Sequence, residues 1–331
     1  MAKNHYDVAG VGNAIVDIIA ECDDEFLIEN KLKKGSMQLL DSNEITKLYR
    51  SINPVAQVSG GSAANTMVGI ASFGGKAVYF GKVADDELGK TFTYDINSAG
   101  IVYNVKPFSG GASTARSIVL VTPDGERTMN TYLGISPKLE SGDLNKEIIA
   151  ASKILYLEGY LFDANLTKDT FYTAAKIAKR SERYVSLTLS DSSCVCRHRE
   201  EFLEFIKSHV DILFANEDEI NSLYQVEDFN VAAELVCCDV KFAALTRGEK
   251  GSIIISKEET VAIPPYAVEK VIDTTGAGDL YSAGFLFGFS NGLDLGLCGR
   301  FGSYAAGKVI TDVGARPKVS LSEINKTEII F

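Results

Sequence analysis

Short apolar runs of strand length alternate along this chain with longer stretches of helical spacing. The first run, residues 6–11, is closed by Gly12, and similar runs cover residues 77–80, 117–121, 153–157, 185–189, 212–215, 242–246 and 252–256. Residues 166–181 and 200–209 carry apolar residues at three- and four-residue spacings, the pattern of a helix with one buried face. This alternation predicts an α/β fold, a mostly parallel sheet with helices on both faces. In such sheets, ligands bind beyond the carboxyl ends of the strands.

Two regions break this rhythm, near residues 18–40 and 100–134, where apolar and polar residues alternate. The second region contains two hairpin signals, Ser109-Gly110-Gly111 and Thr122-Pro123-Asp124-Gly125. We expect both insertions to contribute to a small β-sheet that acts as a lid. The chain has no repeat and no Pro-rich linker, so residues 1–331 are expected to form a single domain with this lid attached.

The overall charge and the cysteine pattern exclude several classes of function. A net charge of −11 argues against nucleic acid or an anionic membrane as the main partner, although local N–H groups can still bind a phosphate. The six cysteines and three histidines do not have the spacing of a structural zinc site. The sequence shows no signal peptide and no apolar run of transmembrane length, so we expect a cytoplasmic protein with reduced thiols. These totals do not distinguish a monomer from a homodimer.

One seven-residue segment, Asp273-Thr274-Thr275-Gly276-Ala277-Gly278-Asp279, places a glycine-rich turn between two carboxylates and just before an apolar stretch. Glycines allow backbone conformations in which several N–H groups point at one spot. If a helix begins here, its unpaired N–H groups and its positive dipole end create an anion site. A phosphate held beside a base is the arrangement that phosphoryl transfer to a hydroxyl needs. The alternative is an ordinary N-cap with a glycine turn, and the seven residues alone do not choose between them.

Three other phosphate-binding motifs are incomplete. Gly10-Val11-Gly12 follows a strand as in a dinucleotide-binding fingerprint, but Ile15 stands where the third glycine is required. Residues 84–91 end like a P-loop but begin with alanine and contain three acidic residues. Residues 302–308 have P-loop spacing, yet Val309 replaces the hydroxyl that would bind Mg²⁺. These departures argue against a dinucleotide-dependent oxidoreductase and against a P-loop enzyme.

Two further segments place polar side chains where a ligand would bind. Asn13 and Asp17 follow the first strand, where a carboxylate can accept hydrogen bonds from two sugar hydroxyls. A turn carboxylate near a helix start explains this segment equally well. Gly60-Gly61-Ser62-Ala63-Ala64-Asn65 opens a predicted helix whose small residues allow close approach of a ligand. Asn65 offers both a donor and an acceptor for hydroxyl groups.

Taken in order, these segments resemble a known family. The match comprises Gly12-Asn13 with Asp17, residues 60–65, residues 81–89, Asn216-Glu217-Asp218-Glu219, residues 246–251 and residues 273–279. This set resembles the ribokinase-like (PfkB) family of carbohydrate and nucleoside kinases, over nearly the whole chain from residue 6 to residue 316. The resemblance implies a ribokinase-like fold and an enzyme that transfers the γ-phosphoryl group of ATP to an alcohol.

The resemblance also implies roles on the acceptor side of the reaction. Asp279 would be the base that takes the proton from the acceptor hydroxyl. The N–H groups that would form the anion hole for the transferred phosphoryl group are those of Gly276, Ala277 and Gly278. The residues that would hold the hydroxyls of the acceptor are Asn13, Asp17, Gly61, Ser62 and Asn65.

On the donor side, the resemblance implies ATP with Mg²⁺. Asn216 and Glu219 would organise Mg²⁺ and phosphate through water, and the nucleotide-binding turn would comprise Thr246, Gly248 and Gly251. Asp273 and the carbonyl of Thr275 match positions that hold a monovalent cation such as K⁺ in many members. Arg127 is our candidate for a lid arginine that closes over the phosphates, and an exposed hairpin charge is the alternative for this residue.

The shared motifs leave the acceptor open between adenosine and a simple sugar such as ribose, fructose or ketodeoxygluconate. Residues 34–39 and 113–117 look more like the adenosine-kinase-like branch. The aromatic residues of 156–162 could stack on a purine, although such residues are also ordinary core. A catalytically idle nucleotide or sugar sensor on the same fold is the alternative from another class of protein, and the intact Asp279 argues against it.

Overall fold

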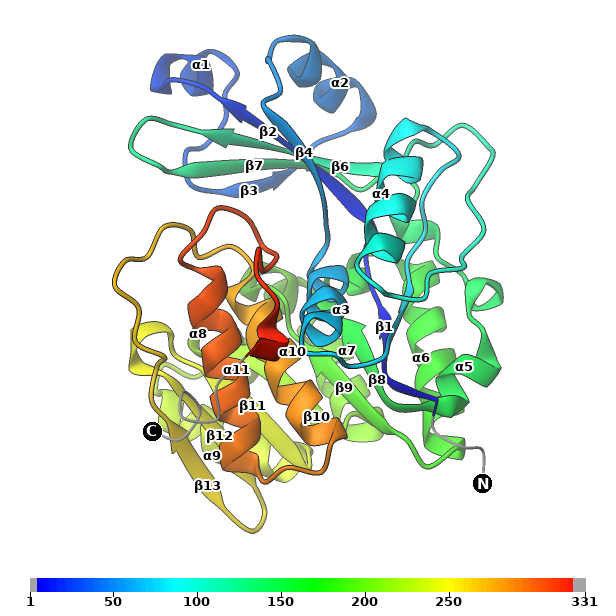
Figure 1. The fold of residues 1–331 in the computed structure, drawn as a ribbon, viewed down its shortest axis with the longest axis vertical. Helices are drawn as coiled ribbons and strands as arrows, with labels where there is room; N and C mark the ends of the chain where they lie inside the picture. The colour runs from blue at the N-terminus through cyan, green and yellow to red at the C-terminus, as the bar shows by residue number, and fades with distance from the viewer. Residues whose placement is uncertain (1–4, 324–331) are drawn as a thin grey trace.

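The computed structural model describes residues 5–323 and contains one large and one small sheet (Figure 1). The large sheet has eight strands, of which β11, β10, β9, β8, β1 and β5 run parallel and β12 and β13 are antiparallel to their neighbours. In spatial order they are β13 (Thr260–Ile263), β12 (Ser252–Ser256), β11 (Phe242–Thr246), β10 (Ile212–Asn216), β9 (Tyr184–Thr188), β8 (Ser152–Glu158), β1 (Tyr6–Val11) and β5 (Ala77–Phe80). The predicted mostly parallel α/β sheet is confirmed. The ends of the predicted 1–331 domain, residues 1–4 and 324–331, lie outside the described part of the chain.

Helices cover both faces of the large sheet, as expected for parallel strands. One face carries α3 (Ser62–Ser72), α10 (Ala277–Ser290) and α11 (Leu295–Val309). The other face carries α5 (Lys146–Ala151), α6 (Asn165–Arg180), α7 (Ser192–His209), α8 (Glu217–Tyr224) and α9 (Phe229–Asp239). Short 3₁₀ helices cover Ser136–Lys138, Ser141–Asp143, Gly159–Asp163, Gly248–Lys250 and Leu321–Glu323.

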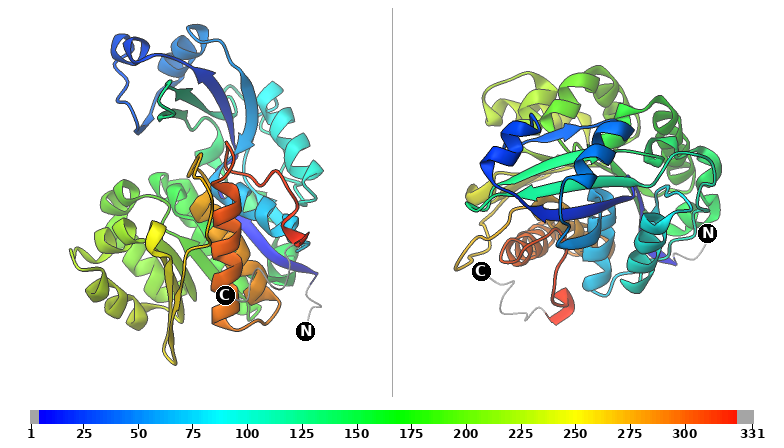
Figure 2. Two further views of the ribbon diagram at one scale, coloured as in Figure 1. Left: turned by 60° about the vertical axis from the view of Figure 1, so that its left-hand side comes forward. Right: turned by 90° about the horizontal axis from the view of Figure 1, so that it is seen from above.

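The small sheet stands beyond the carboxyl ends of the parallel strands, as Figure 2 shows from two further sides. Its five strands, in spatial order, are β3 (Met37–Leu39), β7 (Arg127–Tyr132), β6 (Ala115–Val121), β2 (Ile15–Glu21) and β4 (Ala56–Gly60). Helices α1 (Asp24–Glu29) and α2 (Ser42–Arg50) cover its outer face, and α4 (Glu87–Ser98) lies beside β2 and β4. Alternate residues of β2 and β6 pack under α1 and α2 in a separate small core.

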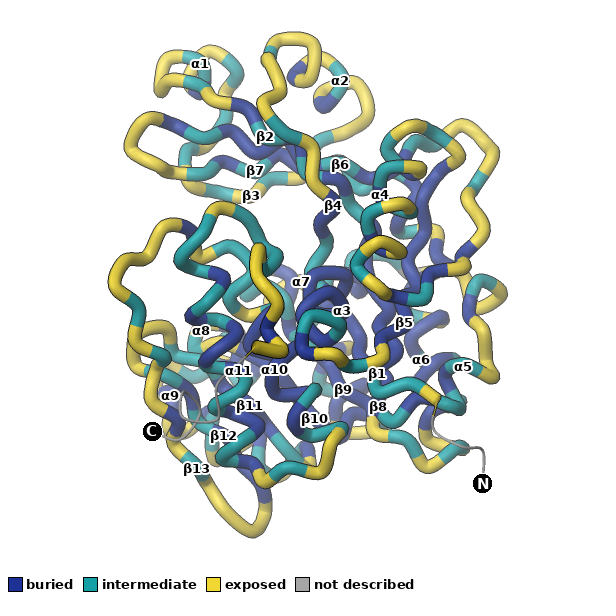
Figure 3. Tube along the Cα trace, viewed as in Figure 1, coloured by how far each residue is buried: buried dark blue, intermediate teal, exposed yellow. Residues whose placement is uncertain are grey.

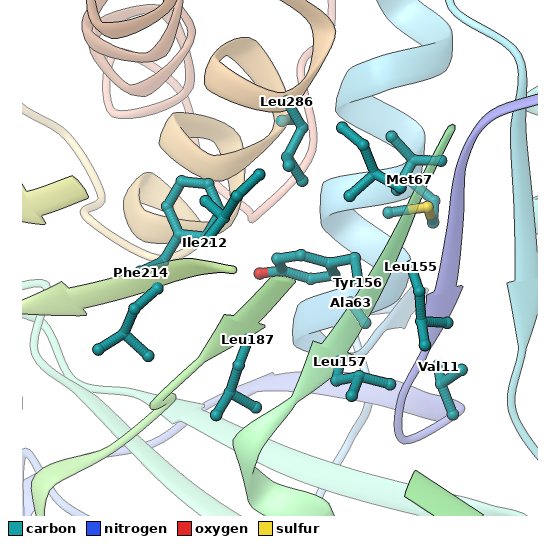
Figure 4. Close-up of a cluster of buried hydrophobic side chains, with 14 of the residues drawn as sticks. Val11, Ala63, Met67, Leu155, Tyr156, Leu157, Leu187, Ile212, Phe214 and Leu286 are labelled. Carbon is teal, nitrogen blue, oxygen red and sulfur yellow. The ribbon is translucent and has the colours of Figure 1, made fainter. Parts of the chain in front are cut away.

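The main core covers both faces of the large sheet, and the part that positions the site lies between the sheet and α3 with α10. Helix α3 is buried over most of its length (Figure 3). Its small residues let α10 approach closely, because a methyl group on Gly69 would lie 2.6 Å from Cβ of Ala283. Figure 4 shows the buried ring of Tyr156 between the strands and these two helices. This packing brings the first turns of α3 and α10 to the same edge of the sheet.

Three details differ from the sequence expectations. The Ser109-Gly110-Gly111 hairpin is wrong, because Phe108 pairs with Ala84 of another loop instead of with the following strand. The run 117–121 lies in β6, inside the second predicted insertion, but β4 lies outside both predicted insertions, and its polar sequence gives little strand signal. Helix α7 begins before residue 200, since Asp191 caps it, and it changes direction at His198.

The junction between β4 and α3 depends on a glycine. Gly61 precedes α3 with a φ of 96°, and a side chain there would place Cβ only 2.1 Å from the carbonyl oxygen of Asn13. An L-residue would suffer both backbone strain and a collision with fixed backbone.

We expect Gly61→Ala to destabilise the fold by about 2–5 kcal/mol, the sum of left-handed strain and overpacking. Gly74→Ala is the matched control, because Gly74 has a φ of 90° but open space around the added Cβ. It should cost only the strain, roughly 1–2 kcal/mol. Urea unfolding of both variants checks this, and equal losses of unfolding free energy would contradict the proposed collision.

Candidate active site

Polar side chains from four parallel strands gather at one edge of the large sheet. Asn13 follows β1, Glu158 ends β8, Asn216 ends β10 and Thr246 ends β11. Parallel strands bring their carboxyl ends to the same edge, so residues distant in sequence become neighbours. The N-termini of α3 and α10 face this edge and complete the site.

Asp279 lies in the first turn of α10 and is held by two residues of α3. Its Oδ1 accepts a hydrogen bond from Oγ of Ser62 at 2.6 Å, and its Oδ2 accepts one from Nδ2 of Asn65 at 3.0 Å. Burial raises the pKa of Asp279, whereas these hydrogen bonds and the charge of Arg316 oppose that rise. A carboxylate oriented in this way is suited to accept a proton from a bound hydroxyl.

The glycine turn before α10 presents free N–H groups beside Asp279. Gly276 has a φ of 79°, and a methyl group there would lie 2.6 Å from backbone atoms of Ala315. Of the three predicted anion-hole donors, Ala277 is engaged, because its N–H donates to the carbonyl of Thr274 at 3.2 Å. Within residues 5–323, the N–H groups of Gly276 and Gly278 have no such acceptor. The turn therefore offers two of these donors at the positive end of a helix.

Asp273 is fully engaged within the protein. Its Oδ1 accepts from the N–H and the hydroxyl of Thr275, at 3.0 and 2.7 Å. Its Oδ2 accepts from the N–H of Gly314 at 2.7 Å and from Nη1 of Arg127. Burial favours a higher pKa for Asp273, but these contacts outweigh burial and the pKa is lowered. Arg127 of β7 also donates to the Thr275 hydroxyl at 3.0 Å, so the predicted lid arginine and cation ligand contact each other.

A buried carboxylate that sequence reasoning missed, Glu158, connects the end of β8 to Asn13 and to the start of α3. Oε1 of Glu158 accepts from the backbone N–H and Nδ2 of Asn13, and its Oε2 accepts from the N–H of Ala63 at 2.8 Å. Burial raises the pKa of Glu158 to about 7. Oδ1 of Asn13 accepts from Ser136, so both ends of the Asn13 amide are engaged, and the amide holds Glu158 in place. The only sign of this role in the sequence was that an acidic residue, Glu158, directly follows the apolar run 153–157.

Asp17 lies on the face of the small sheet that looks toward Asp279. Its carboxylate makes no hydrogen bond or ion pair with any residue between 5 and 323. Burial raises its pKa to about 6, although Arg316 and Arg127 lower it. Arg316 was also missed, because it lies in an irregular loop after α11 without any local pattern.

The predicted nucleotide-binding residues line two adjoining cavities. The first, about 610 Å³, is polar and includes Asn216, Glu219, Thr246, Gly248 and Gly278 in its lining. The second, about 560 Å³, is mainly apolar, and its lining includes Gly251, Tyr266, Val268, Val271 and Ile310. Both cavities share Thr246, Gly248, Gly278 and Tyr281. A nucleotide could therefore place phosphates in one cavity and a base in the other.

Asn216 and Glu219 form a reciprocal cap at the start of α8. Oδ1 of Asn216 accepts from the N–H of Glu219 at 2.8 Å, while the Glu219 carboxylate accepts from the side chain and N–H of Asn216. Burial raises the pKa of Glu219 to about 7. In the described part of the chain, no group of three or more His, Cys, Asp or Glu side chains could hold a metal ion by itself.

Comparison with known proteins agrees with this geometry. The model of the pfkB family carbohydrate kinases matches residues 49–321. This chain belongs to that family. It is a sugar or nucleoside kinase, a phosphotransferase with an alcohol group as acceptor, which confirms the family and the enzyme class expected from the sequence.

The relatives of this kinase differ in their stated acceptors. It is 51% identical to the adenosine kinase from Sinorhizobium meliloti, with a TM-score of 0.91 over 96% of this chain and 97% of that one. It is 47% identical to a probable sugar kinase from Rhizobium etli CFN 42, with a TM-score of 0.92 and 97% coverage of both chains. It is also 31% identical to probable fructokinase-5 from Arabidopsis thaliana, over 69% of this chain and 72% of the relative.

Burial bears on one further sequence expectation, the stacking of a purine on the aromatic residues of 156–162. Tyr156 and Phe162 are fully buried, and Phe162 stacks on Phe202 with 4.1 Å between ring centroids. These two aromatics belong to the core, so a purine does not stack on them, whereas Tyr160 of the same segment is half-buried. Within residues 5–323, no helix of this kinase is long and apolar enough to cross a membrane.

The raised pKa of Asp17 gives a pH test of acceptor binding. Because only the ionised carboxylate has both oxygens free to accept hydrogen bonds from two hydroxyls, acceptor affinity should be constant well above pH 6 and fall below the Asp17 pKa of about 6. The expected slope is roughly tenfold per pH unit. Calorimetry with adenosine and with fructose, in the absence of nucleotide, measures it. The control Asp17→Asn should bind more weakly without this pH dependence, and an unchanged slope in that variant would contradict the assignment.

Proposed function

We propose that this kinase transfers the γ-phosphoryl group of ATP to a hydroxyl of adenosine. The observation that carries the choice of acceptor is the unpaired carboxylate of Asp17, which faces Asp279 from an otherwise mostly apolar surface of the small sheet. Two neighbouring ribose hydroxyls can donate to this carboxylate, while a purine needs an apolar surface beside it. The 51% identity to an adenosine kinase supports the same acceptor.

The apolar surface follows from the alternation of side chains along the strands. Ile18 and Ala20 of β2 pack under the outer helices, so Asp17 and Ile19 lie on the opposite, inner face. Strand register places further residues on this inner face, namely Val58, Val119, Met129, Met37 and Leu39. Val58, Met37 and Leu39 are 42, 38 and 50% exposed, so they are available to a ligand.

The chemistry of transfer fits the residues around Asp279. Asp279 accepts the proton of the acceptor hydroxyl, and the free N–H groups of Gly276 and Gly278 stabilise the charge on the transferred phosphoryl group. Mg²⁺, which prefers phosphate and water oxygens with few protein ligands, supplies neutralising charge when bound. Asn216 and Glu219 would hold it through water, because their side chains already bind each other.

In this proposal the small sheet is the lid of a single domain and excludes water from the reaction. Arg127 already connects the sheet to the glycine turn through Asp273 and Thr275, and on closure it would reach the phosphates. An idle sensor would need neither the oriented base nor the free N–H groups. A simple sugar remains the competing acceptor, because relatives include a probable sugar kinase and a fructokinase.

Coupled ADP release with adenosine, ribose, fructose and ketodeoxygluconate tests the proposal. We expect the highest kcat/KM with adenosine, and little ATP hydrolysis without an acceptor. Asp279→Asn should lower kcat by roughly 10²–10⁴ while ATP affinity stays near normal, because the amide cannot take the proton. A higher kcat/KM with fructose would reject the acceptor but leave the kinase. Full activity of Asp279→Asn would reject the mechanism.

We propose that K⁺ binds at Asp273 and the carbonyl of Thr275 when Arg127 leaves Asp273 for the phosphates, and that it stiffens the glycine turn. Turnover should then rise when K⁺ is added to a sodium-free assay in Tris buffer. Since Arg127 places its charge against Asp273, Arg127→Gln should lower the K⁺ concentration needed for half-activation. Arg50→Gln, at an exposed position on α2, is the control and should leave it unchanged. No response of the wild type to K⁺ would remove the cation from the proposal.

A further inference from the structure

Three consecutive residues of the loop after α11 contact three different parts of the site. The N–H of Gly314 donates to Oδ2 of Asp273 at 2.7 Å, and Ala315 packs against Gly276. Arg316 donates from Nε to Oδ1 of Asn65 at 3.0 Å. This loop therefore supports both carboxylates that flank the glycine turn, Asp273 directly and Asp279 through Asn65.

The hydrogen bond from Arg316 determines which way the Asn65 amide points. A guanidinium has only donors, so it can be faced only by the amide oxygen. The amide nitrogen is then directed at Asp279, where Nδ2 lies 3.0 Å from Oδ2. In the reversed orientation, the amide oxygen would face the carboxylate, and this contact is favourable only when Asp279 is protonated and cannot act as a base.

We propose that Arg316 is a positioning residue for the catalytic base: it holds Asn65 in the orientation that donates a hydrogen bond to Asp279 and keeps Asp279 ionised. This inference rests on the proposed function, in which Asp279 takes the acceptor proton. Arg316 acts through Asn65 and touches no reacting atom.

Arg316 is half-buried, and the end of its guanidinium that is shielded from solvent supports this role. Its Nη2 is shielded from solvent and has no hydrogen-bond partner in the described structure. Leaving a donor of a charged group unpaired is costly, which indicates that another contact of the side chain maintains its position. That contact is the Nε–H bond to Asn65.

The contacts from Arg316 through Asn65 to Asp279 form a relay, and the charged surroundings give this relay a measurable effect. Groups that face Asp279 or Arg316 from the packed elements are Asp17 of β2, Tyr79 of β5, Asp95 of α4, Tyr156 and Glu158 of β8, Tyr160 of the 3₁₀ helix Gly159–Asp163 and Glu219 of α8. None of these groups carries a positive charge. The charge of Arg316 lowers the pKa of Asp279 against the effect of burial.

Two substitutions separate the hydrogen bond from the charge. Gln carries Nε2 at the same number of bonds from Cα as Nε of arginine, so Arg316→Gln retains a donor without the charge. Arg316→Met retains the length of the chain up to that atom and loses both. If orientation of Asn65 matters, Arg316→Met should move the acid limb of the kcat–pH profile to higher pH by roughly one unit. Arg316→Gln should stay much closer to wild type, and kcat of both variants should recover at high pH.

A double-mutant comparison identifies the route through Asn65. In an Asn65→Ala background, Arg316→Met should add little further shift, because the amide that it orients is absent. Equal acid limbs for Arg316→Gln and Arg316→Met would overturn the relay. An undiminished shift in the Asn65→Ala background would overturn it as well and assign the effect to charge alone.

A second readout does not depend on turnover. In protein labelled with ¹³C at aspartate carboxyl carbons, the Asp279 signal is assigned by its loss in Asp279→Asn and then titrated. The relay predicts a higher midpoint in Arg316→Met than in Arg316→Gln, even if none of the tested acceptors is phosphorylated. Failure of the proposed function is thus distinguishable from failure of the relay. Should Arg316→Met not fold, a shift in Arg316→Gln as large as that in Asn65→Ala would overturn the relay.

Discussion

The close packing of α3 against α10 is the constraint on which the site depends. Both helices begin at the ligand edge of the large sheet, and small residues such as Gly69 and Ala283 at their contact allow them to lie side by side. Because the first turns of the two helices lie side by side, Ser62 and Asn65 of α3 reach Asp279 of α10. A larger residue at the contact would separate the helices and remove the hydrogen bonds that orient the base.

The balance of charge in the cleft is the second physical constraint. Asp17, Glu158, Glu219 and Asp279 all have raised pKa values because burial penalises their ionised forms. The protein opposes this penalty in different ways at different positions. Backbone and amide donors hold Glu158 and Glu219, whereas arginine side chains from opposite sides of the cleft act on Asp17. Asp17, whose carboxylate accepts no hydrogen bond from the described residues, is therefore the group of these four best suited to bind a ligand.

Much of the fold and part of the site could be predicted from the sequence. The runs 6–11, 77–80, 242–246 and 252–256 coincide with strands, because a strand buried on both faces reads as a continuous apolar run. The glycine turn and the helix after it were equally readable. Strand β4 was not predicted because its polar sequence carries little strand signal. The hairpin predicted from Ser109-Gly110-Gly111 did not form because Phe108 pairs with Ala84, a residue distant from it in the sequence.

The sequence by itself determined the alternation of strands and helices in the large sheet, the glycine turn before α10 and the family to which the chain belongs. These features depend on residues within one local segment, where spacing and residue type directly set the backbone conformation. Only the tertiary structure decided the pairs that complete the site. Glu158 meets Asn13 across 145 positions, Arg127 meets Asp273 across 146, and Arg316 meets Asn65 across 251. No local pattern encodes such pairs, because each exists only after packing has brought two distant segments to the same edge of the sheet.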